Sequence, residues 1–136
     1  MANGTIAFDT LSTSGQITGT AKSVDTDYVV NGSAKAWINF DGNSTNIRDS
    51  LNVSSQTDVS TGRDQITLTN AMNNAGYSIG YLIGSTNANS TTAATNRLAA
   101  LITTTVYDLN TVYVSGGTSG LGSYEQNLSN IFGDLA

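Results

Sequence analysis

Two short stretches carry residue types that could bind a phosphate or a calcium ion. Residues 116–123 read GGTSGLGS, but a P-loop needs a lysine directly after its last glycine, and this chain has Ser123 there. Residues 41–46 read DGNSTN, but an EF-hand loop needs glycine sixth and glutamate twelfth, where this chain has Asn46 and Asn52. We therefore interpret both stretches as turns, and we predict neither a metal ion nor a cofactor.

The sequence lacks several side chains on which enzymes commonly depend for catalysis. There is no cysteine and no histidine, which removes a thiolate nucleophile, a Ser-His-Asp triad and an ordinary zinc site. Asp25 and Asp27 would share one face of a strand, where solvated surface charge is the favoured interpretation. Glu125 and nine aspartates are the only acids, and their spacing defines no acid–base pair. The sequence predicts no catalytic residue and a protein that is not an enzyme.

The charge of the chain also excludes some partners. Five basic residues against ten acidic ones give a net charge of −5, and the basic residues are scattered singly. A nucleic-acid or anionic membrane surface would require a basic patch, so we expect neither partner. No apolar run approaches the roughly 18–20 residues that span a bilayer, and the first residues lack the features of a signal peptide.

The elements that hold these residues are expected to be strands. Charged residues make up only 11% of the chain, and Thr, Ser, Asn and Gly replace them. Residues 35–40 and 77–83 alternate with period two, which indicates half-buried strands. Short strands separated by turn residues favour a single all-β domain over 1–136, an antiparallel β-sandwich of jelly-roll type.

Further elements follow from local signals. Asn31-Gly32 favours a type I′ hairpin turn between strands at 27–30 and 34–40. Residues 56–63 are predicted as a polar turn and residues 96–107 as strand. The chain is expected to close with a strand or a short helical turn at 128–135.

Large side chains on the two alternating strands are candidates for the core or for a subunit interface. The alternation places Trp37 on the face opposite Ile38, so either both faces are covered or Trp37 packs between subunits. Trp37 and the tyrosines could also stack on sugars, although aromatic residues on strands are more often core or interface anchors. The candidates are Trp37, Ile38, Phe40, Tyr77, Ile79 and Tyr81.

The order of motifs over residues 34–77 resembles a small module of bacteriophage tail fibres and of short virion proteins from marine and cyanobacterial phages. The motifs are AKAWINFDG at 34–42, IRDSLNVSS at 47–55, ITLT at 66–69, and AM at 71–72 followed by AGY at 75–77. The chain departs from the module at 63–65, where RDQ stands in place of the usual aromatic residue. The resemblance implies a trimeric β-sandwich on the virion. Because the chain has no coiled-coil or triple-β stalk, we expect residues 1–30 to serve as a docking or oligomerisation segment.

Three functions remain open from the sequence. The first is a virion structural protein of the tail or its fibres, made in the host cytoplasm, that contacts other virion proteins and can contribute to host-surface attachment. The second is a capsid decoration protein that clamps major capsid subunits, which a short free-standing chain favours. The third is a carbohydrate-binding module that recognises a surface glycan. The sequence does not place the protein on tail, fibre or capsid.

Overall fold

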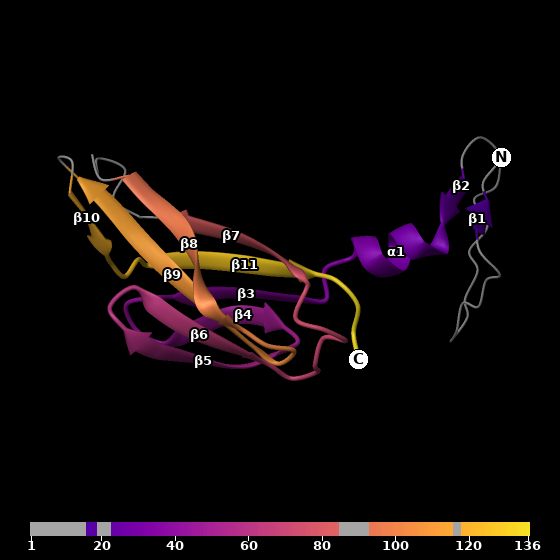
Figure 1. Cartoon of the computed structure of the whole chain (residues 1–136), viewed down its shortest axis with the longest axis horizontal. Helices are drawn as coiled ribbons and strands as arrows, with labels where there is room; N and C mark the ends of the chain where they lie inside the picture. Colours follow the sequence, from indigo (N-terminus) through magenta and orange to yellow (C-terminus); the bar gives the residue numbers. More distant parts are fainter. Residues whose placement is uncertain (1–15, 19–22, 85–92, 116–117) are drawn as a thin grey trace.

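The computed structural model describes residues 16–18, 23–84, 93–115 and 118–136, and it shows a sandwich of two antiparallel sheets with little helix (Figure 1). The elements before the sandwich are β1 (Gln16–Thr18), β2 (Ser23–Asp25) and the helix α1 (Thr26–Gly32). The sandwich consists of β3 (Ala36–Asp41), β4 (Asn46–Leu51), β5 (Val53–Ser60), β6 (Arg63–Leu68), β7 (Ser78–Gly84), β8 (Ala93–Ile102), β9 (Val106–Ser115), β10 (Thr118–Leu121) and β11 (Gln126–Phe132). The all-β sandwich predicted from the sequence is confirmed.

The first sheet has four strands in the order β4-β3-β11-β7. Its centre joins the first and the last strand of the sandwich, with Ile38 opposite Ser129 and Trp37 opposite Asn130. On its far side, β11 pairs with β7, so that Leu128 lies opposite Leu82 and Asn130 opposite Gly80. Because side chains alternate between the two faces of a strand, Trp37, Leu82, Leu128 and Asn130 share the outer face.

The second sheet is built around β9. One edge of β9 pairs with β8, and the other pairs first with β6 and then with β10, while β5 lies on the far side of β6. Consecutive strands pair within one sheet in β3–β4, β5–β6 and β8–β9. This connectivity differs from the expected jelly roll, because short turns keep these strand pairs in one sheet.

The core lies between the two sheets. It contains alternate residues of the strands that face each other, and Met72 and Tyr77 cover one end. Three tyrosine hydroxyls are bonded inside it: that of Tyr77 donates to the carbonyl of Thr103, and that of Tyr107 pairs with the hydroxyl of Ser129. The third belongs to Tyr81. The buried hydrophobic residues are Ala36, Ile38, Phe40, Ile66, Leu68, Met72, Tyr77, Tyr107, Leu109 and Ile131.

Asn52 connects β4 to β5 at the place where the chain passes from one sheet to the other. Its φ of 56° is in the left-handed region, which asparagine tolerates better than most residues. Its amide nitrogen donates to the carbonyls of Lys35 (3.1 Å) and Asn70 (3.3 Å), and its side-chain oxygen accepts from the N–H of Asn70 (2.7 Å). One asparagine thus ties the start of β3 to the end of β6.

The predicted hairpin at Asn31-Gly32 is wrong. Both residues belong to the last turn of α1, and the strand predicted at 27–30 is helical. In Figure 1, α1, β2 and β1 lie beyond one end of the sandwich, the end at which the C-terminus is also found. Lys35 anchors the helix there, since its ammonium group donates to the carbonyl of Val30 and to the hydroxyl of Ser33.

The predicted polar turn at 56–63 is also wrong over most of its length, because β5 runs to Ser60 and β6 begins at Arg63. The single strand predicted at 96–107 is confirmed only in part, because the segment holds the end of β8 and the start of β9 with a turn at 103–105 between them. The closing strand is confirmed as β11, which begins two residues earlier than expected. No helix in the described part of the chain is long and apolar enough to span a membrane.

Candidate interaction surface

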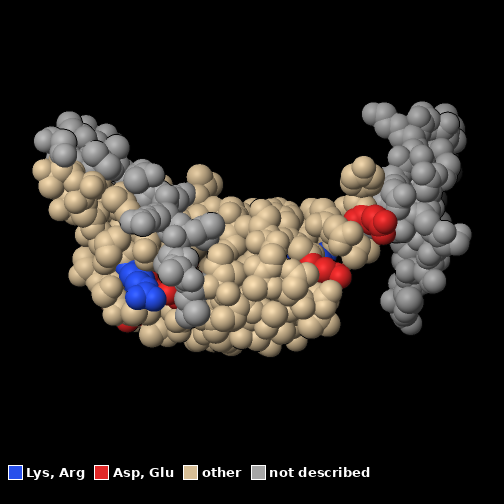
Figure 2. Space-filling model, in the orientation of Figure 1, with Lys and Arg blue, Asp and Glu red and all other residues tan. Residues whose placement is uncertain are grey.

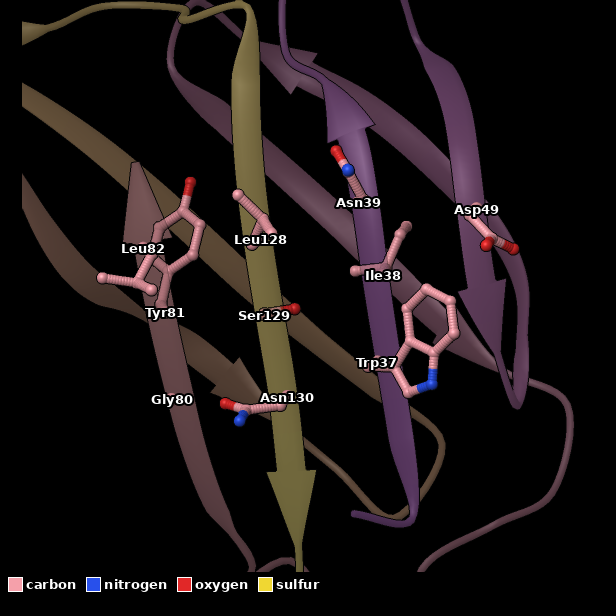
Figure 3. Close-up of a pocket in the computed structure, with 10 residues that line it drawn as sticks. All are labelled: Trp37, Ile38, Asn39, Asp49, Gly80, Tyr81, Leu82, Leu128, Ser129 and Asn130. Carbon is pink, nitrogen blue, oxygen red and sulfur yellow. The ribbon is translucent and has the colours of Figure 1, made fainter. Parts of the chain in front are cut away.

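The outer face of the four-stranded sheet carries an open groove of about 580 Å³ (Figure 3). Trp37, Leu82 and Leu128 supply its apolar surface, and Asn39, Asp49 and Asn130 supply its polar groups. Gly80 has no side chain, and the amide of Asn130 lies over it, because a β-carbon at Gly80 would come within 2.2 Å of the Asn130 oxygen. We call these residues the outer groove.

The apolar residues of this face are unusually open to solvent. Leu82 is 69% exposed and Leu128 40%, and Leu51, which lies opposite Trp37 on β4, is 49% exposed. A contiguous apolar surface on a folded domain commonly marks a place of contact with another molecule. Figure 2 shows that uncharged residues form most of the visible surface of the sandwich.

The second exposed apolar feature is α1. Tyr28, Val29 and Val30 follow one another, and they are 76%, 47% and 53% exposed. Every residue from Asp27 to Gly32 is exposed, so the sandwich does not cover this helix. We call residues 26–32 the arm. It lies at the end of the segment 1–30 that was expected to dock or oligomerise, most of which lies outside the described side chains.

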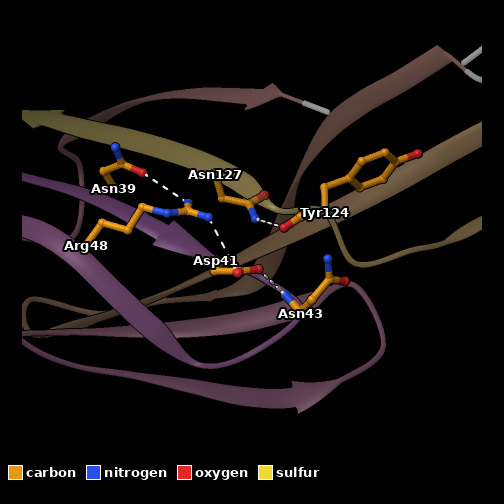
Figure 4. Close-up of polar contacts among 6 residues, drawn as sticks. All are labelled: Asn39, Asp41, Asn43, Arg48, Tyr124 and Asn127. Carbon is orange, nitrogen blue, oxygen red and sulfur yellow. Dashed lines mark hydrogen bonds and ion pairs between the residues drawn. The ribbon is translucent and has the colours of Figure 1, made fainter. Parts of the chain in front are cut away.

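A network of polar contacts connects Asn39 of the outer groove to the β3–β4 turn (Figure 4). Arg48 forms an ion pair with Asp41 at 3.5 Å and a hydrogen bond to Asn39 at 3.5 Å. The carboxylate of Asp41 also accepts the N–H of Asn43 at 2.9 Å. The stretch that resembled a calcium loop is therefore the β3–β4 turn, in which the first carboxylate is occupied by protein groups.

The glycine-rich stretch at 116–123 is likewise structural where it is described. Thr118–Leu121 form β10, which pairs with the end of β9, and the N–H of Gly122 donates to the carbonyl of Thr111 at 3.1 Å. Gly116 and Gly117 lie outside the described residues. Among the described residues, no three acidic side chains lie close enough together to hold a metal ion.

A buried polar cluster lies inside the sandwich, near the β3–β4 turn. Tyr81 donates to the side-chain oxygen of Asn127 at 2.9 Å and is 3.0 Å from the hydroxyl of Thr111. Gln56 donates to Asp64 at 2.7 Å.

Burial raises the pKa of Tyr81 to about 12, with a smaller opposing effect of the Thr111 bond and a further increase from Asp64. Shifted pKa values often mark functional sites, but Asp64 is only 2% exposed and Asn127 is fully buried. A substrate could not reach them, so we interpret the cluster as structural.

Asp64 is expected to make stability depend on pH. Burial raises its pKa from 3.8 to about 6, with the Gln56 bond opposing and the charge of Asp58 adding to the increase. The folded state therefore holds a proton that the unfolded state has lost between about pH 4 and 6, so the free energy of unfolding falls as pH rises through this window. Asp64→Asn keeps an acceptor for Gln56 and should raise the free energy of unfolding by on the order of 2 kcal/mol at pH 8 and by little at pH 4.

Urea unfolding of both proteins at the two pH values checks this prediction. The difference in free energy of unfolding between variant and wild type is compared at the two pH values. All other carboxylates are the same in both proteins, so their contributions cancel in that difference. An equal effect of Asp64→Asn at pH 4 and pH 8 would contradict a raised pKa at Asp64.

The candidates from the sequence divide between the two faces. Ile38, Phe40 and Tyr77 are buried in the core, Ile79 packs against it, and Tyr81 points inward as a partly buried side chain. Trp37 alone lies on the outer face, opposite Ile38. Sequence reasoning missed Leu82 and Leu128. A signal existed for Leu82, since the alternation of 77–83 placed it with Ser78 and Gly80 on the polar face.

Comparisons with known proteins do not assign the outer groove or the arm. The chain matches no protein-family model, no curated protein and no solved structure. A functional interpretation therefore depends on the geometry of the groove and the arm, together with the motif order over 34–77.

Proposed function

We propose that this protein is a structural component of a bacteriophage virion, a tail-fibre-like β-sandwich module that assembles with copies of itself and with other virion proteins. The observation that carries the proposal is the exposed apolar surface at two separate places, the arm and the outer groove. Interfaces between proteins are built around such aromatic and aliphatic anchors.

The residues behind the resemblance to phage modules have structural roles, which is what a shared module would require. Ala36 and Phe40 of the first motif fill the core. Asn52 of the second motif ties two strands together, and Gly62, in the turn after it, has a φ of +68°. Groups with shifted pKa values are buried inside the sandwich and serve its packing. These roles support a module selected for assembly rather than for chemistry.

Purified virions of the phage that encodes the chain provide the test. We expect quantitative mass spectrometry to find the protein in the particle and immunogold labelling to place it on the tail or its fibres. Hundreds of copies per particle would instead favour the alternative, a capsid decoration protein that stabilises the head. Absence from purified particles would contradict both forms of the proposal.

A second candidate is a carbohydrate-binding module, because the outer groove combines Trp37 with Asn39, Asp49 and Asn130. An aromatic face and planar polar groups suit a sugar ring, and host-surface attachment would use such a site. The three exposed leucines on the same face fit a protein partner better than a sugar. A glycan array with the purified protein tests this candidate, and binding of one glycan class, lost in Trp37→Ala, would support it.

A further inference from the structure

The fold leaves two apolar features uncovered that the same copy does not bring together. Lys35 is fixed in the sheet, since its N–H donates to the carbonyl of Ile131 at 2.8 Å, and its ammonium group holds the end of α1 through Val30 and Ser33. Only Ser33 and Ala34 separate Lys35 from the helix, and two residues reach about 7 Å at most. Figure 1 shows that the helix points away from the sandwich.

The outer groove of the same copy begins at Trp37, two residues after Lys35, and extends across the sheet to β7. Leu82 is on β7, two strands away from β3, at which the arm is attached. Neighbouring strands are about 4.8 Å apart, so the arm would have to cross about 10 Å of the sheet surface after reversing its direction. Doing so would break the bonds of Lys35 to Val30 and Ser33. While these bonds hold the arm away from the sheet, an arm that reaches Leu82 comes from another molecule.

We propose that the arm of one copy binds in the outer groove of a second copy. Successive helix residues point about 100° apart, so Val29 and Val30 pack against Trp37, Leu82 and Leu128 while Tyr28 lies at the edge of the contact. The partner is a second copy of this chain because each copy carries both halves of the contact. Such a contact is heterologous: it uses different surfaces on the two molecules and closes into a ring when the rotation between copies permits. This inference deepens the self-assembly part of the proposed function and rests on it.

The area involved approaches that of a specific contact. The most exposed apolar residues of the two features are Tyr28, Val29, Val30, Leu51, Leu82 and Leu128. An aromatic side chain such as Tyr28 offers about 150–250 Å² and the aliphatic ones offer less, so the exposed parts of the six sum to several hundred Å². The helix backbone and the polar rim of Asn39, Asp49 and Asn130 add to this area, toward the roughly 1,000 Å² expected of a biological interface.

Three matched substitutions test the proposal, each replacing one exposed aliphatic residue by aspartate. Val30→Asp disables the arm, Leu82→Asp disables the groove, and Val59→Asp is the control, since Val59 is 44% exposed on β5 of the other sheet. Sedimentation velocity over a concentration series measures association. We expect the wild type to oligomerise, the first two variants to associate at least about tenfold more weakly, and the control to associate like the wild type.

Mixing the two disabled variants distinguishes an arm–groove contact from one in which the outer grooves of two copies pack against each other. The groove of Val30→Asp is intact, and so is the arm of Leu82→Asp, so the mixture should form a one-to-one complex although neither variant self-associates. If two grooves packed on each other, Leu82→Asp would dissociate but Val30→Asp would not. That result would overturn the proposal.

Trp37 is the only tryptophan of the chain, so its fluorescence reports directly on the groove. Association should shift its emission to shorter wavelength in the wild type, and a synthetic peptide of residues 23–35 should produce the same shift when added to Val30→Asp. Circular dichroism checks that each variant is folded. A wild type that stays monomeric, with an emission that does not change with concentration or with the peptide, would overturn the proposal. A shift produced only by a glycan would also overturn it.

These measurements use purified protein, so their failure is distinct from failure of the proposed function. A monomer that is nevertheless found in virions would refute the arm–groove contact and leave the virion assignment standing. A protein that forms the ring but is absent from virions would support the arm–groove contact and refute the virion assignment.

Discussion

Gly62→Ala is expected to lower the free energy of unfolding by about 4 kcal/mol. Gly62 lies in the turn between β5 and β6 with a φ of +68°, where an alanine costs about 1 kcal/mol in backbone strain. An added β-carbon would come within 2.6 Å of the nitrogen and 2.8 Å of the oxygen of Gly122, and within 2.8 Å of the oxygen of Thr111. All three are backbone atoms that cannot rotate away, so overpacking adds up to about 3 kcal/mol.

The loss should be large because this turn joins three parts of the chain. The carbonyl of Gly62 accepts from Thr111 on β9 at 2.8 Å, and its N–H donates to the hydroxyl of Ser123 at 3.1 Å. Moving the turn to relieve the clash would break both bonds. Urea unfolding at one fixed protein concentration gives the measurement, since association makes stability depend on concentration.

Gly32→Ala is the matched control for Gly62→Ala. Gly32 lies in α1, and a β-carbon added there would meet nothing within 4 Å. Alanine is the better helix former, so stability should stay the same or rise slightly. Equal unfolding midpoints for the two variants would show that the crowded contacts around Gly62 do not exist.

Arg63→Met is expected to lower the free energy of unfolding by about 3 kcal/mol. This is the lower end of the range for leaving a buried charge without its partner, because Asp108 is fully buried while the Arg63 side chain is 38% exposed. Asp108 is fully buried in the middle of the second sheet. The guanidinium group of Arg63 donates to it from Nε at 3.0 Å and from a terminal nitrogen at 2.5 Å, and Gln65 donates at 3.1 Å. Without Arg63, the buried carboxylate of Asp108 loses its positively charged partner, and of the donors named here it keeps only the neutral amide of Gln65.

Two further variants test whether the buried charge of Asp108 causes the loss of stability. Arg48→Met removes a second arginine–aspartate pair, but this one lies at the surface at 3.5 Å, and its loss should cost less than about 1 kcal/mol. Adding Asp108→Asn to Arg63→Met removes the uncompensated charge and should restore part of the stability. If Arg63→Met costs no more than Arg48→Met, the burial of Asp108 does not control the energy of the pair.

The sandwich could be predicted because its signals are local. Period-two alternation in 35–40 and 77–83 reflects burial on one face of each strand, and it placed Ile38 and Trp37 on opposite faces. The edge strand β5 was missed because the outer positions of an edge strand need no apolar residues, and in 53–60 only Gln56 is buried. The arm was missed because Val29 and Val30 favour strand by their branched side chains, and Asn31-Gly32 is equally suited to a turn or to a helix end.

The groove could be predicted only in part, because its residues meet through pairing between distant strands. Trp37 was identified on β3, but its neighbours on the outer face come from β11 and β7, more than 40 residues later in the chain. The bond between Arg63 and Asp108 depends equally on the pairing of β6 with β9. Residues 63–65 have roles on both faces of β6: Arg63 and Gln65 hold Asp108 on one face, and Asp64 bonds Gln56 on the other.

The pairing of β3 with β11 has a consequence for synthesis of the protein. The central strand pair of the first sheet joins residues 36–41 to residues 126–132, so this sheet cannot form until β11 has left the ribosome. At about 5–20 residues per second, β3 waits roughly 4–18 s for its partner. During that time the arm, which is made earlier, is already available to other chains, including finished copies. Nascent chains could therefore meet their neighbours before their own sandwich has closed.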